Sequence, residues 1–222
     1  MKKEKGAITL FVLIAILFFI IVLINLLIVT ANRANKQIET TQQAIDIYGK
    51  SVDEIEDLYK SYFGDKNVIP IYTAEQLQTL ATLKTGETKN ITINEAGGKI
   101  YTLSLDKVYV LRNDIDASVL GEWIPIGTET DPFNGILEGA NYEIKGININ
   151  SEEAGKGLFG CNTGTIRNLN ISKLDINSTY TGDSNIGGFV SYNKGGNVDN
   201  CNIIDSRIIA TGNNVGRNCR KK

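Results

Sequence analysis

One eight-residue pattern occurs twice in the C-terminal half of this 222-residue chain, and the repeat restricts the folds open to it. Residues 164–171 (GTIRNLNI) recur 32 residues later as 196–203 (GNVDNCNI). Glycine-rich turns precede both copies, at 157–160 and 187–190, and a third copy starts at 214–216. Repeats of this length are typical of solenoids, in which each unit contacts only its neighbours.

Each copy carries only two or three apolar side chains that point one way, too few to bury a core alone. Stacked coils would join equivalent residues in a continuous apolar column: Ile166 with Val198, Leu169 with Cys201 and Ile171 with Ile203. We expect Asn168 with Asn200, and Asn162 with Asn193, to form side-chain ladders, because they occupy equivalent turns. Asparagine also tolerates the left-handed backbone that such turns require. The glycines are expected to supply positive φ angles at the corners.

The rest of the C-terminal half has a compatible pattern. Short alternating segments separated by glycine and asparagine predict strands at 101–105, 109–111, 142–144, 147–149, 166–171 and 198–203. The sequence therefore predicts an all-β solenoid, an incomplete parallel β-helix, over residues 100–216. Residues 217–222 carry four cations and are expected to form an irregular basic tail. A solenoid that ends in mid-coil exposes its core, as expected of a fragment of a longer array.

The N-terminal half begins with an apolar run at residues 7–31, which follows the basic leader 1–6. As a helix this 25-residue run would be about 38 Å long, enough to cross a hydrocarbon core of about 30 Å. We therefore predict a single transmembrane helix, with membrane lipid as its partner. Lys2, Lys3 and Lys5 stand just before the run, so we expect a cytoplasmic N-terminus and an extracellular C-terminal domain.

Residues 32–63 have two apolar positions in every seven, which predicts a helical stalk that continues the membrane helix. The two positions are occupied by Ile38, Ile45, Val52 and Tyr59, and by Thr41, Tyr48, Ile55 and Tyr62. One interpretation is a coiled coil that causes self-association through residues 38–62. The other is a helix whose apolar stripe packs on its own globular domain. Tyrosines pack poorly in a two-stranded coil, which favours the second.

Residues 64–99 are expected to connect the stalk to the solenoid. Gly64 and Pro70 end the stalk helix, and Thr73 with Gln76 forms a capping-box pattern. A short helix over residues 74–83 should follow. We expect it to plug the open end of the β core.

The composition excludes several kinds of chemistry. The chain has no histidine, which removes Ser-His-Asp and Cys-His nucleophile systems and imidazole zinc sites. The net charge of −2 provides no basic field for nucleic acid. Cys161 and Cys201 are interpreted as small buried side chains, and Trp123, between apolar neighbours, as a core residue. We predict no catalytic residue, no metal site and no cofactor.

The paired carboxylates Asp114 and Asp116 are the strongest candidates for chemistry, with Glu129, Asp131 and Glu138 further along. One interpretation is a glycosidase acid–base pair or a calcium site, since parallel β-helices host both. The other, which we favour, is that Asp114 and Asp116 accept hydrogen bonds from turn amides while the residue between them points inward.

The leader resembles that of type IV prepilins and pseudopilins. Residues 3–10 read KEKGAITL, and in that family a short basic leader ends in glycine, is cut by a membrane peptidase and leaves a methylated N-terminus. The resemblance implies cleavage between Gly6 and Ala7. The family usually has glutamate at the fifth mature position, where this chain has Phe11, and this departure opposes incorporation into a filament. An uncut signal anchor is the alternative.

The repeat resembles the GLUG motif of bacterial surface proteins. The matching residues are Gly157, Leu158, Phe159, Gly160, Gly164, Ile166, Asn168, Leu169 and Ile171, and in the second copy Gly188, Val198, Asn200, Cys201 and Ile203. The resemblance covers about residues 71–216 and implies a right-handed parallel β-helix outside the cell, as in adhesin-like proteins and the non-catalytic regions of immunoglobulin-cleaving metalloproteases. The HExxH motif of those proteases is absent, so no peptidase activity is implied.

These observations lead to one main functional hypothesis and two alternatives. The chain is expected to be a non-enzymatic, membrane-anchored cell-surface protein that binds a host or cell-wall glycan or protein, or has a structural role. The first alternative is a minor pilin-like subunit processed after Gly6. The second is a carbohydrate-active β-helix enzyme whose turnover would depend on Asp114.

Overall fold

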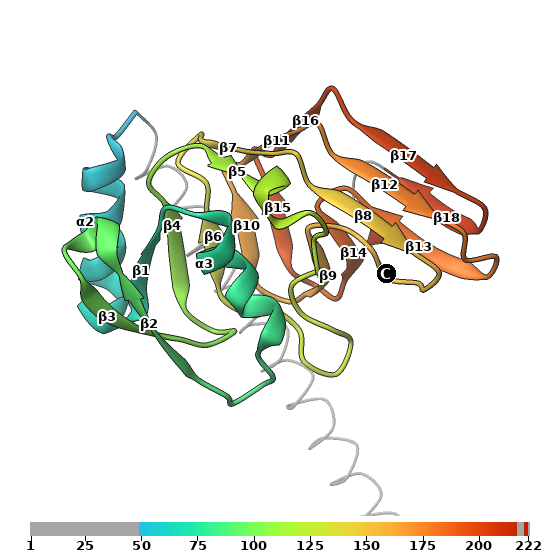
Figure 1. Cartoon of the computed structure of the whole chain (residues 1–222). Helices are drawn as coiled ribbons and strands as arrows, with labels where there is room; N and C mark the ends of the chain where they lie inside the picture. Colours follow the sequence, from blue (N-terminus) through green and yellow to red (C-terminus); the bar gives the residue numbers. More distant parts are fainter. Residues whose placement is uncertain (1–48, 217–219, 222) are drawn as a thin grey trace, which may run out of the picture. The chain divides into compact units, whose positions relative to one another are not determined.

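The structure is a computed structural model that describes residues 49–216 and 220–221 (Figure 1). The leader, the apolar run and the stalk as far as residue 48 lie outside these residues. Residues 51–222 form one unit. In the described part of the chain, no helix is long and apolar enough to cross a membrane.

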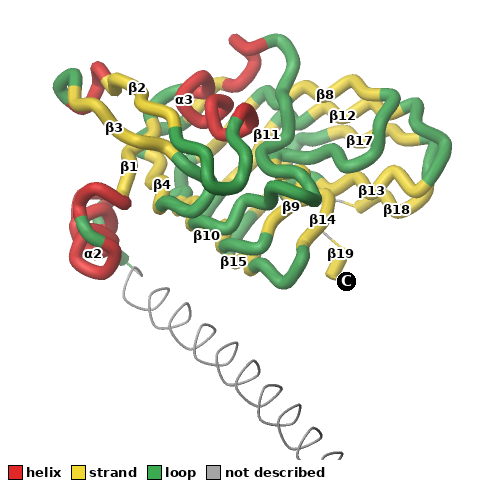
Figure 2. The backbone as a smooth tube through the Cα atoms, turned by 90° about the horizontal axis from the view of Figure 1, so that it is seen from below, coloured by secondary structure: helices red, strands yellow, loops and turns green. Residues whose placement is uncertain are grey.

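Parallel strands stacked in successive coils form a β-solenoid of about four turns (Figures 1 and 2). The first sheet contains β1 (Val68–Ile71), β4 (Val108–Leu111), β6 (Ile136–Glu138), β10 (Thr165–Arg167) and β15 (Asn197–Asp199). The second contains β5 (Ile115–Asp116), β7 (Glu143–Lys145), β11 (Asn170–Ser172) and β16 (Asn202–Ile204). The third contains β8 (Asn148–Ser151), β12 (Asp175–Ser178) and β17 (Arg207–Ala210). Two smaller sheets pair β13 (Asp183–Gly187) with β18 (Asn213–Gly216), and β14 (Val190–Asn193) with β9 (Phe159–Asn162) and β19 (Arg220–Lys221).

The pairing register confirms the repeat found in the sequence. Ile166 pairs in parallel with Val198 in the first sheet, and Ile171 pairs in parallel with Ile203 in the second. Ile166 and Ile171 are fully buried, and Val198 and Ile203 pack against the same core from the last coil. Because parallel partners are separated by one strand spacing, about 4.8 Å, equivalent side chains stack directly on each other. The predicted all-β solenoid of stacked coils is therefore confirmed.

The bend inside each repeat is made by asparagine. Asn168 and Asn200 have left-handed φ angles of 52° and 47°, so the strands expected at 166–171 and 198–203 each divide in two. Nδ2 of Asn200 donates a hydrogen bond to Oδ1 of Asn168 at 2.7 Å, which confirms one predicted ladder.

The second ladder is also present, and it lies at the turn before the repeated strand. Nδ2 of Asn162 donates to Oδ1 of Asn193 at 3.3 Å. The same side chain accepts a hydrogen bond from the backbone N–H of Gly164 at 3.1 Å. Asparagine therefore serves both the turn and the contact between coils.

The repeat glycines are required for a reason other than the expected one. A Cβ built on Gly164 would lie 2.1 Å from the carbonyl oxygen of Gly135, the equivalent residue of the preceding coil. A Cβ on Gly157 would lie 2.2 Å from the carbonyl oxygen of Gly187. The expectation that these glycines supply positive φ is wrong, because their role is to let adjacent coils approach closely. Gly195, with φ of 86°, does follow the expectation.

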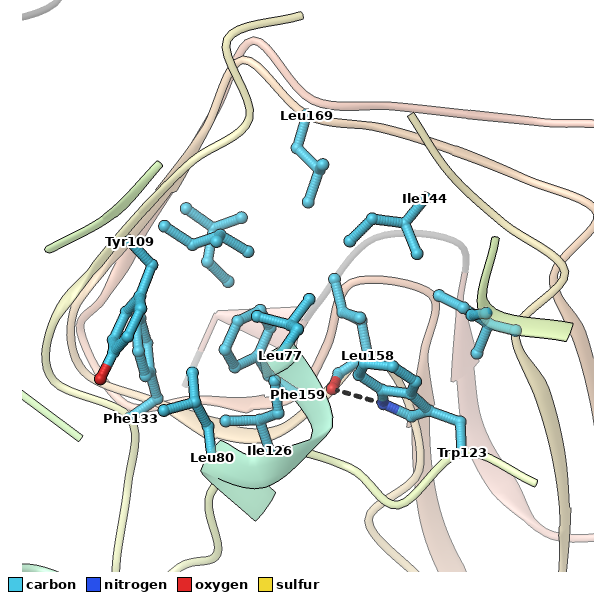
Figure 3. Packing of buried hydrophobic residues seen from close by; sticks show 14 of the residues in the cluster. Leu77, Leu80, Tyr109, Trp123, Ile126, Phe133, Ile144, Leu158, Phe159 and Leu169 are labelled. Carbon is cyan, nitrogen blue, oxygen red and sulfur yellow. Dashed lines mark hydrogen bonds between the residues drawn. The ribbon is translucent and has the colours of Figure 1, made fainter. Parts of the chain in front are cut away.

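The N-terminal end of the solenoid is covered by α3 (Ala74–Gln78) and the 3₁₀ turn Thr79–Thr82. Oγ1 of Thr73 accepts from the backbone N–H of Gln76, whose side chain accepts from the N–H of Thr73, so the predicted capping box is confirmed. Leu77 and Leu80 are fully buried among the core residues, as Figure 3 shows. This packing matches the expected plug.

The core beneath α3 is built from aromatic and branched side chains (Figure 3). The ring centroids of Phe133 and Phe159 are 4.9 Å apart, and those of Tyr109 and Phe133 are 6.3 Å apart. Trp123 is buried as predicted, and its Nε1 donates to the carbonyl oxygen of Leu158 at 3.1 Å. Tilted aromatic pairs at such separations favour a fixed packing of the first coils.

The solenoid begins earlier than the sequence predicts, since β1 already pairs in parallel with β4. The strand expected at 101–105 instead belongs to an antiparallel hairpin of β2 (Lys89–Ile93) and β3 (Lys99–Leu103). Its alternating pattern suits either arrangement, but Gly97 and Gly98 both have a φ of 74° and allow the chain to reverse directly before it.

α2 (Val52–Phe63) is a separate helix rather than the end of an uninterrupted stalk. Gly49 has a φ of 77°, outside the helical range. Oγ of Ser51 accepts from the N–H of Glu54 at 3.4 Å, and the carboxylate of Glu54 accepts from the N–H of Ser51 at 2.8 Å. Residues 49–51 of the helix predicted across residues 32–63 are therefore not helical, and the capping box at Ser51 starts α2.

The described part of the predicted apolar stripe faces the chain's own solenoid. Ile55 and Tyr59 are buried, and α2 contacts β1 and β4 (Figure 1). Tyr62, also on the predicted stripe, is half-exposed. This packing favours the intramolecular interpretation for residues 52–62, whereas the stripe from Ile38 to Tyr48 lies outside the described residues.

We expect Gly164→Ala to lower the free energy of unfolding by about 3 kcal/mol or more, because its methyl group would overlap the backbone of the preceding coil. Gly195→Ala is the matched control. A Cβ there meets nothing within 4 Å, so only the left-handed backbone costs energy, about 1 kcal/mol. Urea unfolding followed by circular dichroism measures both, and equal effects would contradict the close approach of the coils.

Candidate functional site

Both aspartates accept hydrogen bonds from backbone amides, as the favoured interpretation predicts, but the amide bound by Asp114 belongs to strand β7 and not to a turn. Oδ1 of Asp114 accepts from the N–H of Glu143 at 2.9 Å. Oδ1 of Asp116 accepts from the N–H and Oγ of Ser118 at 3.1 and 2.6 Å. Ile115, between them, is buried in the core.

The electrostatic setting of Asp116 does not suit a general acid. The hydrogen bonds from Ser118 lower the pKa of its carboxyl group, and the ammonium of Lys145, 3.4 Å away, acts in the same direction. A carboxylic acid that donates a proton near neutral pH needs a raised pKa instead. Within the described residues, no group of three or more carboxylates or cysteines is placed to hold a metal ion.

The remaining candidate carboxylates have separate structural partners. Glu129 forms an ion pair with Lys194 at 2.9 Å. Oδ1 of Asp131 accepts from the backbone N–H of Thr85 at 3.0 Å, and this hydrogen bond lowers its pKa. Glu129 and Asp131 lie outside the strands, whereas Glu138 ends strand β6 and is fully buried.

The two cysteines of the described chain are not paired with each other. Cys161 is buried, as predicted, whereas Cys201 in the last coil is only partly buried. Burial raises the pKa of the Cys161 thiol and raises that of Cys201 to about 12. Both thiols therefore remain protonated and poorly nucleophilic at neutral pH.

A buried polar cluster of Tyr59, Glu138 and Arg167 joins α2 to the first sheet. Glu138 in β6 and Arg167 in β10 are paired with each other in the parallel ladder of these two strands. Their side chains point away from the core and are nevertheless 0% and 1% exposed. Nε of Arg167 donates to Oε2 of Glu138 at 3.0 Å and to the hydroxyl of Tyr59 at 2.7 Å. The same hydroxyl donates to Oε2 of Glu138 at 2.9 Å.

The second oxygen of Glu138 is also satisfied. Oε1 accepts from the N–H of Ala140 at 2.8 Å and from Nδ2 of Asn168 at 2.9 Å, so the cluster continues into the asparagine ladder. Burial, and after it the charge of Glu138, raises the pKa of Tyr59 well above its usual range. The Tyr59 hydroxyl group therefore stays protonated and donates a hydrogen bond to Glu138.

Charged side chains on the rim of α2 extend the contact. The guanidinium of Arg112, which follows β4, donates to Glu56 at 2.9 Å and also to Asp53. Lys60 pairs with Glu56 at 2.7 Å from the same helix. The two ion pairs of Arg112 therefore join α2 to the end of β4, in addition to the buried cluster.

The sequence pattern does not predict this cluster, because it indicates no role for Arg167 and shows Glu138 only as one of several candidate carboxylates. Two signals were available: Arg167 occupies an outward strand position, and Tyr59 is a polar aromatic residue on the apolar stripe of its helix. Neither signal shows that α2 covers that strand, which is a tertiary contact between residues 108 positions apart.

The outer faces of the second and third sheets carry rows of polar side chains. The register places Asp116 and Lys145 in one row, which continues to the buried Ser172 and the exposed Ile204. It places Asn150 with Asn177 in another, which continues to the exposed Ile209. Successive members are separated by one strand spacing, about 4.8 Å. Such rows offer evenly spaced hydrogen-bonding groups along the solenoid axis.

Comparison of the chain with protein-family models, with curated proteins and with solved structures finds no match.

The proposed leader cleavage site, Gly6 and Ala7, lies outside the described residues. The repeat residues Leu158, Phe159 and Leu169 are fully buried and serve the core rather than an exposed site.

Arg167→Met should lower the free energy of unfolding by about 3–5 kcal/mol, because it leaves Glu138 buried without its cation. Arg207→Met is the matched control. Arg207 pairs with Asp175 at 2.6 Å but is 64% exposed, so its loss should cost less than about 1 kcal/mol. Urea unfolding compares the two, and a small effect of Arg167→Met would show that the buried pair does not hold α2 in place.

Proposed function

We propose that this chain is a non-enzymatic, membrane-anchored cell-surface protein that presents its β-solenoid for binding or structural support. The observation that supports this most is the distribution of polar groups. The candidate catalytic carboxylates Asp114 and Asp116 accept hydrogen bonds from backbone amides, while Asn150 and Asn177 lie exposed and adjacent on the outer face of the third sheet. This arrangement suits a display surface better than a reaction site.

The proposal includes features that the sequence alone suggests. The apolar run at 7–31 would anchor the chain, with the N-terminus in the cytoplasm and the solenoid outside the cell. The resemblance to GLUG-motif surface proteins adds right-handed winding and an adhesin-like role. The partner would be a host or cell-wall glycan or a protein with repeated hydrogen-bonding groups that match the rows.

A minor pilin-like subunit is the second candidate. It is favoured by the leader ending at Gly6 and by the packing of Ile55 and Tyr59 on the chain's own domain, as the first helix packs in pilins. Phe11, at the position where that family usually has glutamate, opposes it. Self-association through residues 38–62 remains part of either proposal.

A carbohydrate-active enzyme is the third candidate, and the hydrogen bonds of the two aspartates count against it. Turnover of a polysaccharide that is lost in Asp114→Ala would establish it in place of the leading proposal.

Expressed in a bacterium, the full chain should sediment with the membrane fraction, and protease added to intact cells should digest the solenoid. The double variant Leu17→Arg, Ile21→Arg should leave the membrane, because two charges at the centre of the run each cost about 2.5–3.5 kcal/mol on insertion. Asn25→Leu, which removes the one amide from the run, should stay there as the matched control.

Mass spectrometry of the N-terminus distinguishes the two anchored forms. An intact Met1 supports the signal anchor, and N-methylated Ala7 supports the pilin-like subunit. A wild-type chain recovered from the cytosol would contradict the proposal in both forms.

A further inference from the structure

The helix α2 is fastened to strands that lie beyond the strand that follows it in the chain. β1 comes next after α2, and within the described residues it stands at the end of the first sheet, paired with β4 alone. α2 lies beside β1 in Figure 1, but its side-chain contacts reach past β1 to the coils of β4, β6 and β10. The helix therefore joins strands of three successive coils.

These contacts are polar and depend on geometry. The guanidinium of Arg112, directly after β4, lies 2.9 Å from the carboxylate of Glu56. The hydroxyl of Tyr59 donates to Glu138 of β6 at 2.9 Å and accepts from Arg167 of β10 at 2.7 Å. The guanidinium of Arg167 also lies 5.2 Å from the centre of the Tyr59 ring. Because hydrogen bonds weaken steeply with displacement, such contacts hold α2 in place until it moves a short distance and then release it.

The junction between α2 and β1 has its own attachments. The carboxylate of Asp65 pairs with Lys99 of β3 at 3.3 Å. The side chain of Asn67 donates to the carbonyl oxygen of Phe63 at 2.6 Å and accepts a hydrogen bond from Lys107, which precedes β4. α2 and β1 are thus attached to the solenoid at separate points, so α2 can detach while β1 keeps its partner.

Tension on the chain would reach α2 before it reaches any coil. Under the proposed function, residues 7–31 hold the chain in the membrane while a bound partner pulls on the outer faces of the solenoid. That tension enters the described residues at the N-terminal end of α2 and acts on its contacts first. Without those contacts the same tension would act directly on β1, a strand of four residues.

A detached α2 would not remain a helix. It has 12 residues, and isolated helices of this length are marginal in water. Its unfolding would lengthen the connection, because residues 51–67 span at most about 60 Å when extended, at roughly 3.5 Å per residue. The added length would lower the tension while the coils stay paired.

We propose that α2 is a strap that takes up tension between the anchored N-terminal segment and the solenoid, and that it detaches as one unit before any coil opens. Its contacts with Arg112, Glu138 and Arg167 set the force at which it detaches. The inference rests on the proposed function for the source of the tension, whereas the strap itself belongs to the described residues.

Optical tweezers test the strap on the full chain in detergent. One handle is attached to the N-terminus and the other to an unnatural amino acid in place of Asn177, which is exposed on the third sheet, so that tension does not run through the last coil. The wild type should show an extension of at most about 60 Å that precedes every loss of a coil.

Tyr59→Phe should make this extension about tenfold faster at a given force, because the buried Glu138 and Arg167 lose the hydroxyl that bonds to both. The later events should keep their forces. Ser61→Ala is the matched control, since it removes a hydroxyl from the same helix that donates only within the helix, to the carbonyl oxygen of Leu58, and it should leave the extension unchanged.

Hydrogen exchange without tension provides a second measurement on the same variants, after circular dichroism has shown that both are folded. The α2 amides should exchange together, through an opening that leaves β4 and β6 protected. This opening should be about tenfold more frequent in Tyr59→Phe than in the wild type.

A first extension much longer than about 60 Å, in which a coil opens together with α2, would overturn the proposal. An extension rate that Tyr59→Phe leaves unchanged, or that Ser61→Ala changes equally, would overturn it as well. Recovery of the wild-type chain from the cytosol would instead overturn the proposed function and leave these measurements as they are, so the two failures are distinguishable.

Discussion

Backbone hydrogen bonding between successive coils is the constraint on which the rest of the structure depends. Each coil is made of strands of a few residues, too short to be stable alone, and each strand is held by its equivalent one coil away. In-register pairing places Ile166 over Val198 and Gly164 over Gly135. The same stacking therefore explains the apolar column and the requirement for glycine at position 164, where a Cβ would overlap the preceding coil.

The same stacking gives the charged cluster its character. Because Glu138 and Arg167 are ladder partners, formation of the coil already places their side chains next to each other. Tyr59 of α2 then hydrogen-bonds to both. A buried ion pair contributes little net stability but makes its own disruption costly. It therefore acts mainly to specify where α2 lies on the sheet.

The repeat predicted what depends on equivalence between coils, namely the stacking of Ile166 on Val198 and of Ile171 on Ile203, and both asparagine ladders. Local chemistry predicted the capping box at Thr73 and the binding of backbone amides by Asp114 and Asp116. The sequence did not reveal β1 in the first sheet, because its coil has no copy of the motif. The break at Gly49 and the contact of Tyr59 with Arg167 depend on tertiary packing that periodicity does not encode.

Methyl nuclear Overhauser effects between stacked residues test the central account most directly. In a methyl-labelled sample, parallel in-register coils predict cross-peaks between Ile166 and Val198, between Ile171 and Ile203, and between Ile176 and Ile208. Absence of all three, with Ile166 contacting other methyl groups instead, would contradict the stacked-coil account.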